Sequence, residues 1–70
     1  MKFYISFGQV HEHTANGKQF DKDCICVVDA PDANAAAKQA FDTFGPKWCM
    51  CYPEVPDMTR FPRGLIRLWQ

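Results

Sequence analysis

The hydrophobic positions of this chain recur with helical spacing in one stretch, residues 29–45 (DAPDANAAAKQAFDTFG). There the apolar residues fall on one stripe of a helix and the polar residues on the opposite side. The stripe consists of Ala33, Ala36, Ala37, Ala40, Phe41 and Phe44, and the polar side of Asn34, Lys38, Gln39 and Asp42. The pattern predicts an amphipathic helix whose alanines allow close packing on a sheet and whose phenylalanines fill the C-terminal end of that interface.

Residues with specific backbone roles mark both ends of this helix. Pro31 ends the preceding segment, and Asp32 is a good N-cap because its carboxylate accepts from the first free N–H groups. Gly45 tolerates the positive φ of a C-terminal cap, and Pro46 prevents continuation. Roughly twelve residues at about 1.5 Å each span about 18 Å, which is the length of a strand of five or six residues. The helix therefore has the length needed to cover a small sheet.

Four other stretches have the patterns of strands. Residues 3–7 alternate apolar and other side chains, and residues 23–28 (DCICVV) are apolar and β-branched. Residues 47–55 (KWCMCYPEV) predict a third strand, which prolines terminate. Residues 65–69 (LIRLW) alternate again and predict a short strand at the edge of the sheet.

A hairpin is predicted between the first two of these strands. Asn16-Gly17 is the strongest short hairpin signal in the chain, because both residues tolerate positive φ. We expect strand residues to extend through Val10 on one side and to resume near Phe20 on the other. This arrangement would give a long hairpin with a flexible tip.

The order of these elements predicts a single α+β domain over residues 1–70, a ββαβ(β) unit with one helix on a small three- or four-stranded, mostly antiparallel sheet. A right-handed crossover through the helix leaves the first strand between the second and the third. The helix covers one face of the sheet, and the other face is expected to be open. Tyr4, Trp48, Met50 and Tyr52 are expected to line it. Such a patch usually marks a partner surface, and a homodimer through it is a further expectation.

Composition narrows the functional classes. The formal net charge of zero argues against a general nucleic-acid binder and against an acidic DNA mimic. No apolar run is long enough to span a membrane, and the N-terminal MKFYISFG lacks a signal-peptide core. We therefore expect a cytoplasmic protein. In a reducing cytosol, the four cysteines are expected to be free thiols or metal ligands rather than disulfides.

Three pairs of potential metal ligands are each separated by one residue. They are His11 and His13, Cys24 and Cys26, and Cys49 and Cys51. In a strand each pair would point to one side, and zinc prefers sulfur and nitrogen donors. Structural zinc sites typically use two-residue gaps, however, and an extended C-x-C pair is splayed by about 7 Å. We favour the interpretation that the cysteines are small buried hydrophobes packed under the helix, with a zinc module as the alternative. No cofactor is expected.

The histidine pair also suggests acid–base chemistry. The candidate acid–base partners of His11 and His13 are Glu12, Asp21 and Asp23. The two histidines lie in an HEHT segment that is similar to the H-x-T motifs of two-histidine phosphoesterases. Those enzymes use two separate motifs, and this chain has a single copy. We therefore favour a solvated hairpin rim over an active site.

The FPRG segment, residues 61–64, predicts a rigid turn in which proline fixes φ and glycine allows positive φ. It would present Arg63 near Arg60 and Arg67. Three arginines close together bind a phosphate or carboxylate bidentately. The alternatives are an ordinary turn with solvated charges, or Arg63 paired to a local aspartate. The chain has no Gly-rich phosphate loop, nucleophile elbow or carboxylate dyad.

Several short words in the chain resemble a group of small accessory proteins encoded by bacteriophages. These words are FGQ followed by His11 and His13, then NG, DKD, FG-x-KW and FPRG, and they run from Phe7 to Gly64. The resemblance implies an accessory protein acting in the cytoplasm of an infected bacterium. Such proteins often bind and disable a host factor, including defence systems. The resemblance implies a setting and no site residues.

These observations together predict a non-enzymatic protein that binds and inhibits a host protein, such as a component of antiviral defence, for instance a CRISPR complex. The expected contact residues are Tyr4, His11, His13, Trp48, Tyr52, Arg60, Arg63 and Arg67. The main alternative is an oligomeric binder of a phosphorylated nucleotide signal, with Arg63 on the phosphate and an aromatic side chain stacked on the base. A zinc module and a small phosphoesterase are further alternatives.

Overall fold

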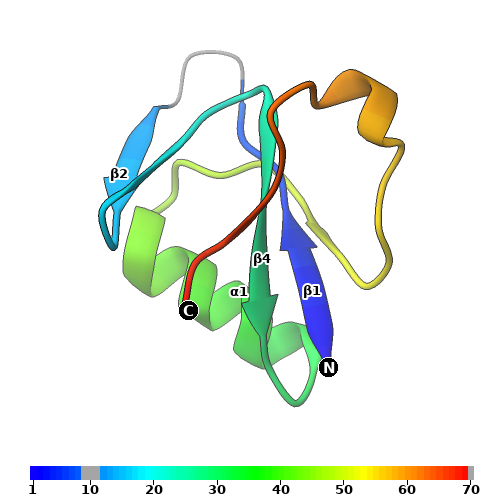
Figure 1. Ribbon diagram of the computed structural model, residues 1–70. Coiled ribbons are helices and arrows are strands. Elements are labelled where there is room, and N and C mark those ends of the chain that lie inside the picture. The colour runs from blue at the N-terminus through cyan, green and yellow to red at the C-terminus, as the bar shows by residue number, and fades with distance from the viewer. Residues whose placement is uncertain (9–11, 70) are drawn as a thin grey trace.

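A computed structural model describes residues 1–8 and 12–69 of the chain. Val10 and His11, which figure in the predictions above, lie outside the described residues. Figure 1 shows a small sheet with one helix against it and a separate two-stranded ribbon beside it. In chain order the elements are β1 (Lys2–Ile5), β2 (His13–Ala15), β3 (Lys18–Phe20), β4 (Cys24–Asp29), α1 (Ala33–Phe44), β5 (Cys51–Tyr52), the 3₁₀ turn η1 (Met58–Arg60) and β6 (Gly64–Arg67).

The main sheet has the strand order β5-β1-β4-β6. β1 runs antiparallel to both β4 and β5, whereas β6 runs parallel to β4. The predicted α+β class is confirmed, as are the position of the first strand between the second and third and the edge position of the fourth. The third strand was predicted too long, because β5 comprises only Cys51–Tyr52 before the prolines.

The predicted caps of α1 are confirmed. The Asp32 carboxylate accepts from the Ala35 N–H at 2.8 Å, and Gly45, with φ of 66°, donates its N–H to the Phe41 carbonyl at 2.7 Å. The helix has 12 residues, and no helix in the described part of the chain is long and apolar enough to cross a membrane.

The buried stripe of α1 is narrower than predicted. Ala36, Ala40 and Phe44 are buried, but Ala33 is exposed and Phe41 is 58% exposed. The buried residues form a single i, i+4, i+8 row. Each residue of a helix is rotated by about 100° from the one before it, so Phe41 points well away from Ala40. Phe41 is turned away from the sheet because Phe44 alone fills the C-terminal end of the interface.

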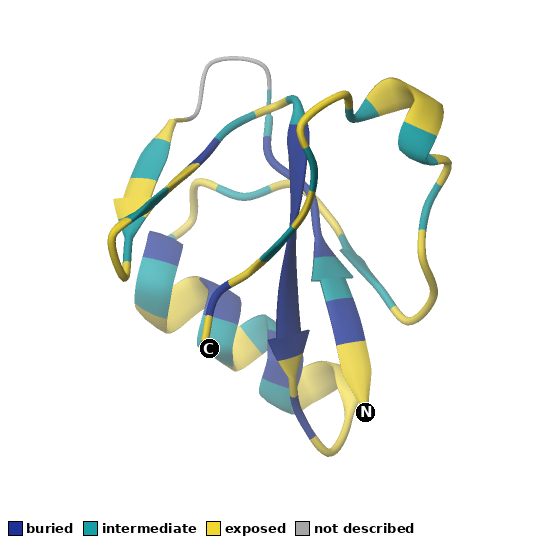
Figure 2. Ribbon diagram, viewed as in Figure 1, coloured by how far each residue is buried: buried dark blue, intermediate teal, exposed yellow. Residues whose placement is uncertain are grey.

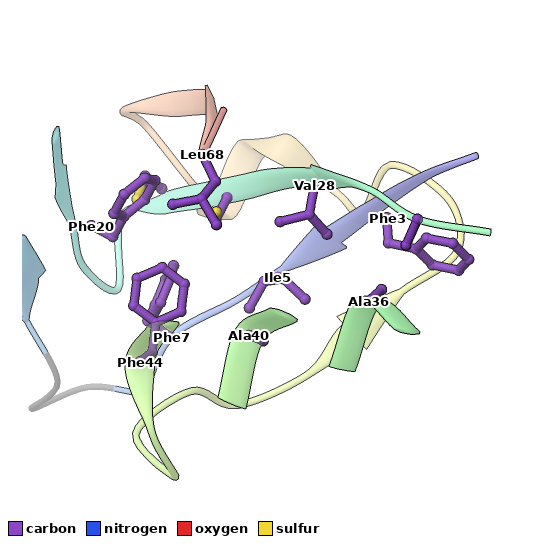
Figure 3. Packing of buried hydrophobic residues seen from close by; sticks show 12 residues of the cluster. Phe3, Ile5, Phe7, Phe20, Val28, Ala36, Ala40, Phe44 and Leu68 are labelled. Carbon is purple, nitrogen blue, oxygen red and sulfur yellow. The ribbon is translucent and has the colours of Figure 1, made fainter. Parts of the chain in front are cut away.

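An aromatic cluster forms around Phe44. Its ring meets the ring of Phe7 edge-on at 4.9 Å and that of Phe20 at 5.4 Å, and the His13 ring lies 5.1 Å away. Figure 3 shows Phe7, Phe20 and Phe44 gathered at one end of the core, with Leu68 pointing into the space between sheet and helix. The cluster therefore joins β1, the ribbon and α1 in one apolar contact.

The Asn16-Gly17 turn closes the β2–β3 ribbon. Asn16 has φ of 52° and Gly17 of 75°, and Ala15 faces Lys18 across the turn. The ribbon is a separate sheet and not a long extension of the β1–β4 pair, so the predicted long hairpin is wrong. Its tip is tied to the C-terminal segment, since the Asn16 side-chain amide donates to the Leu68 carbonyl at 2.7 Å and the Lys18 ammonium to the Arg67 carbonyl at 2.6 Å.

The face of the sheet opposite α1 is open only in part, which corrects the prediction of an open face. Figure 2 shows β4 buried along nearly its whole length. Ile25 and Val27 alternate away from the helix and are still only 0% and 8% exposed. The connection 53–63 returns the chain from β5 to the start of β6, and its Arg60 and Phe61 lie around a hollow with Ser6. This connection therefore covers the Ile25 end of that face.

The two helix phenylalanines provide a test of the packing. We expect Phe44→Ala to lower the free energy of unfolding by about 3–5 kcal/mol, because it removes a buried aromatic ring from a tight cluster. Phe41→Ala should change it by less than about 0.5 kcal/mol, as for a surface substitution. Urea denaturation of both variants measures the difference, and equal effects would contradict the burial described here.

Candidate functional site

A row of four side chains crosses the sheet on the face opposite α1. Because Phe3 and Ile5 are buried against the helix, Tyr4 points to the other side. Tyr4 pairs in register with Tyr52 of β5 and Val27 of β4, and Val27 pairs with Arg67 of β6. Three strand spacings make the row about 14 Å long. We call Tyr52, Tyr4, Val27 and Arg67 the outer row.

Two shallow hollows flank one end of the outer row and share the residues Tyr52, Arg60 and Phe61. The first, of about 400 Å³, is completed by Pro53, Glu54, Val55, Pro56 and Asp57. The second, of about 420 Å³, is completed by Ser6, Phe7, Gly8, Lys22, Asp23 and Cys49. The two rings and the guanidinium that line both hollows thus lie between them, and we call Tyr52, Arg60 and Phe61 the ridge.

Arg60 is held at this ridge by the structure of η1. The Asp57 carboxylate accepts from the Thr59 hydroxyl at 2.7 Å and from the Thr59 N–H at 3.1 Å, which caps η1. These hydrogen bonds, together with the nearby Arg60 charge, lower the pKa of Asp57. The Arg60 guanidinium itself has no side-chain hydrogen bond or ion pair among the described residues, so it is available to a partner.

Arg63 is engaged inside the molecule. Its guanidinium lies 3.0 Å from the Asp21 carboxylate and donates to the Gln19 carbonyl at 3.1 Å. Its backbone N–H donates to the Asp23 carbonyl at 2.8 Å. This is the pairing to a local aspartate that the sequence left open. The predicted cluster of three arginines does not form, because Arg60 lies at the ridge, Arg63 points to β3, and Arg67 lies in the outer row.

Trp48 does not lie on the predicted face. It packs against the cluster on the α1 side of the sheet, where Cys51 also lies. Met50 is 50% exposed. Of the aromatic contact residues predicted for the outer side, Tyr4 and Tyr52 are there and half-buried, and Trp48 is not.

Cys24 and Cys26 lie under α1 as predicted, and both are 0% exposed. Burial raises the pKa of the Cys26 thiol to about 12 and also raises that of Cys24. Cys51 is half-buried, and Cys49 is exposed, so the prediction of buried cysteines is wrong for Cys49. All four cysteines are free thiols. The described residues contain no group of three or more side chains placed to hold a metal ion.

His13 is not a solvated rim residue. Its ring packs on Phe7 and Phe44 at 5.7 Å and 5.1 Å, and Nε2 donates to the Lys47 carbonyl at 2.7 Å. The ring therefore contributes to the aromatic cluster and to the connection after α1. His11 lies outside the described residues.

Two contributors to this surface were missed by the sequence reasoning. Phe61 was counted only as part of a turn, although an apolar residue between prolines in a long connection signals a segment that packs back on the domain. Lys2 was not considered, yet strand alternation from Phe3 places it on the same face as Tyr4.

Comparison with known proteins identifies no relative: no family model, curated protein or solved structure matches this chain.

The Arg63 contacts predict a stabilising role. We expect Arg63→Ala to lower the free energy of unfolding by about 1 kcal/mol, because it leaves the Asp21 carboxylate and the Gln19 carbonyl without their partner. Arg60→Ala, which removes no side-chain hydrogen bond or ion pair to another described residue, should stay within about 0.5 kcal/mol of the parent. Chemical denaturation measures both, and a double-mutant cycle with Asp21→Ala tests the pair. Absence of coupling would rule it out.

The buried thiols predict a loss of stability in alkali. The raised folded-state pKa of Cys26 means that its contribution is complete below the ordinary thiol value of 9.0 and is lost as the pH rises toward about 12. In that window the unfolded chain releases a proton that the folded chain keeps. The free energy of unfolding therefore falls by about 1.4 kcal/mol for each pH unit and for each such thiol. Cys26→Ala should show a shallower fall in urea titrations between those values. Identical slopes would contradict the burial of this thiol.

Proposed function

We propose that this protein is a non-enzymatic binding protein that uses the outer row and the adjoining ridge to occupy the surface of a partner protein. The observation that carries the proposal is the row of Tyr52, Tyr4, Val27 and Arg67 across four hydrogen-bonded strands, next to the unpaired Arg60. Tyrosine and arginine are the side chains most enriched among residues that dominate binding energy.

Preorganisation supports this use of the surface. Tyr4 lies on an interior strand bonded on both sides, and Tyr52 is paired to it across the β1–β5 ladder. Arg60 is the last residue of the capped 3₁₀ turn η1. Side chains on a rigid frame lose little conformational entropy on association, so more of their contact energy appears as affinity.

The surroundings of Cys24, Cys26 and His13 also support binding rather than catalysis. A thiol acts as a nucleophile through its thiolate, and burial disfavours the thiolates of Cys24 and Cys26. The His13 ring is packed in the aromatic cluster. The nucleotide alternative has less support, since Arg63 is engaged with Asp21 and Trp48 packs on the other side of the sheet.

The identity of the partner follows from the setting that the sequence suggests. The resemblance to phage-encoded accessory proteins leads us to propose a host protein in the bacterial cytoplasm, and within that class a component of antiviral defence such as a CRISPR complex. Blocking such a component requires a rigid surface with a few strong contact residues, and the outer row provides them.

A capture experiment with matched variants tests the proposal. The tagged protein is used to isolate partners from a bacterial lysate, alongside Tyr4→Ala/Tyr52→Ala and the control Phe41→Ala on the exposed side of α1. We expect the control to retain a captured protein and the tyrosine double variant to lose at least about tenfold in affinity, as hot-spot truncation does. Circular dichroism confirms that each variant is folded. Full retention by the double variant would refute this contact surface.

A further inference from the structure

The formal net charge is zero, but the charged side chains are distributed unevenly over the folded protein. Most acidic side chains are occupied within the molecule. Asp21 pairs with Arg63, Asp23 with Lys22, Asp42 with Lys38, and Asp29 with the N-terminal amine, while Asp32 and Asp57 cap α1 and η1. By contrast, Lys2, Arg60 and Arg67 have no ion pair among the described residues. Among the described residues, Lys18 and Lys47 also lack an ion pair, and so do Glu12, Asp32, Glu54 and Asp57. The position of Lys2, Arg60 and Arg67, and not an excess of positive charge, therefore distinguishes these three cations.

These three cations share one side of the molecule. Arg67 is in the outer row, and Lys2 is two residues along β1 from Tyr4, about 7 Å away on the same face. Lys2, Arg67 and the half-exposed Trp69 line a small hollow of about 80 Å³ at the end opposite the ridge. Arg60 stands at the ridge itself. The outer row thus has cations at both ends, Lys2 and Arg67 at one end and Arg60, which shares its hollow with Glu54 and Asp57, at the other.

One acid lies among them without cancelling their charge. Asp29 is the register partner of Lys2, but its carboxylate lies 3.5 Å from the N-terminal amine, and Lys2 makes no ion pair with it. Counting this amine, the Asp29 end of the face carries three positive groups against one negative group.

Resting on the function proposed above, we propose that the partner is an acidic protein surface, whose separate carboxylates meet Lys2, Arg67 and Arg60 around a centre formed by Tyr4 and Tyr52. Complementary charge of this kind accelerates encounter and fixes orientation. A protein surface fits better than a nucleic acid because the cations are separated by tyrosine and valine side chains. Glu54 and Asp57 also line the hollow beside Arg60, where they would repel a continuous phosphate chain.

The charge preference is measurable without the natural partner. The ¹⁵N-labelled protein is titrated by NMR with poly-L-glutamate and, separately, with single-stranded oligothymidylate. We expect poly-L-glutamate to shift the amide signals of Lys2, Tyr4, Arg60 and Arg67 and to leave Lys38 unmoved. Binding should weaken at least about threefold when sodium chloride rises from about 50 to about 300 mM, since salt screens exposed charges. Shifts spread over α1, or tighter binding of oligothymidylate, would overturn the proposal.

Charge reversal gives the matched comparison. The triple variant Lys2→Glu/Arg60→Glu/Arg67→Glu should bind poly-L-glutamate at least about tenfold more weakly. The control variant Lys38→Glu, which reverses an exposed cation on α1, should change binding by less than about twofold. If the triple reversal does not fold, the corresponding glutamine variant is used. Equal weakening by the triple variant and by Lys38→Glu would overturn the assignment of this face.

The outcome separates this inference from the proposed function. A partner captured from lysate that binds the triple variant as well as the parent, and loses binding with Tyr4→Ala/Tyr52→Ala, leaves the function standing and removes the acidic partner. A partner insensitive to the tyrosine substitutions removes the proposed surface, whatever the titration with poly-L-glutamate shows.

Discussion

The packing of aromatic rings around Phe44 is the contact on which the rest of this structure depends. A domain of 70 residues buries only about 60% of its unfolded surface, so a few large side chains must connect all its elements. Phe44 comes from the last turn of α1, Phe7 follows β1, and Phe20 ends β3. One cluster therefore fixes the helix on the sheet and the ribbon against both. The small alanines along the remainder of α1 then allow close approach, with Ala36 and Ala40 fully buried.

The same cluster explains why the chemically suggestive residues of the sequence are structural. His13 lies beside Phe44 and donates to the Lys47 carbonyl, so its position in β2 places its ring against the aromatic cluster. Cys24 and Cys26 alternate toward α1 because β4 lies between β1 and β6 in the sheet, with one face against the helix. Arg63 is structural as well, because its guanidinium connects the start of β6 to the ribbon through Asp21 and Gln19. Tyr4, Tyr52, Lys2 and Arg67 lie on the other face of the sheet and take no part in this cluster.

Local signals in the sequence were enough to predict the helix, its caps, the Asn16-Gly17 turn and the order of the central strands. These features depend on backbone preferences and on apolar periodicity, which residues close together in the sequence determine. Non-local contacts were not predictable in the same way. Nothing near Trp48 in the sequence indicates that it lies on the α1 side, and nothing near Arg63 identifies Asp21 as its partner. Phe41 fits the helical stripe as well as Phe44 does, and only the aromatic cluster determines which of the two is buried.

The parallel pairing of β6 with β4 links the proposed binding surface to the closure of the chain. Val27 and Leu68, joined by a 3.0 Å backbone hydrogen bond, are separated by about forty residues, and closing a loop of that length costs about 3 kcal/mol in chain entropy. Burial of the Leu68 side chain returns about 1.5–3 kcal/mol, and the Asn16 and Lys18 bonds add to this. The ladder with β4 and the packing of Ile66 also hold β6 in place, and Arg67 takes its place in the outer row only when β6 is docked. A molecule that holds Arg67 would therefore also stabilise the last strand by mass action, so recognition and completion of the fold form one equilibrium.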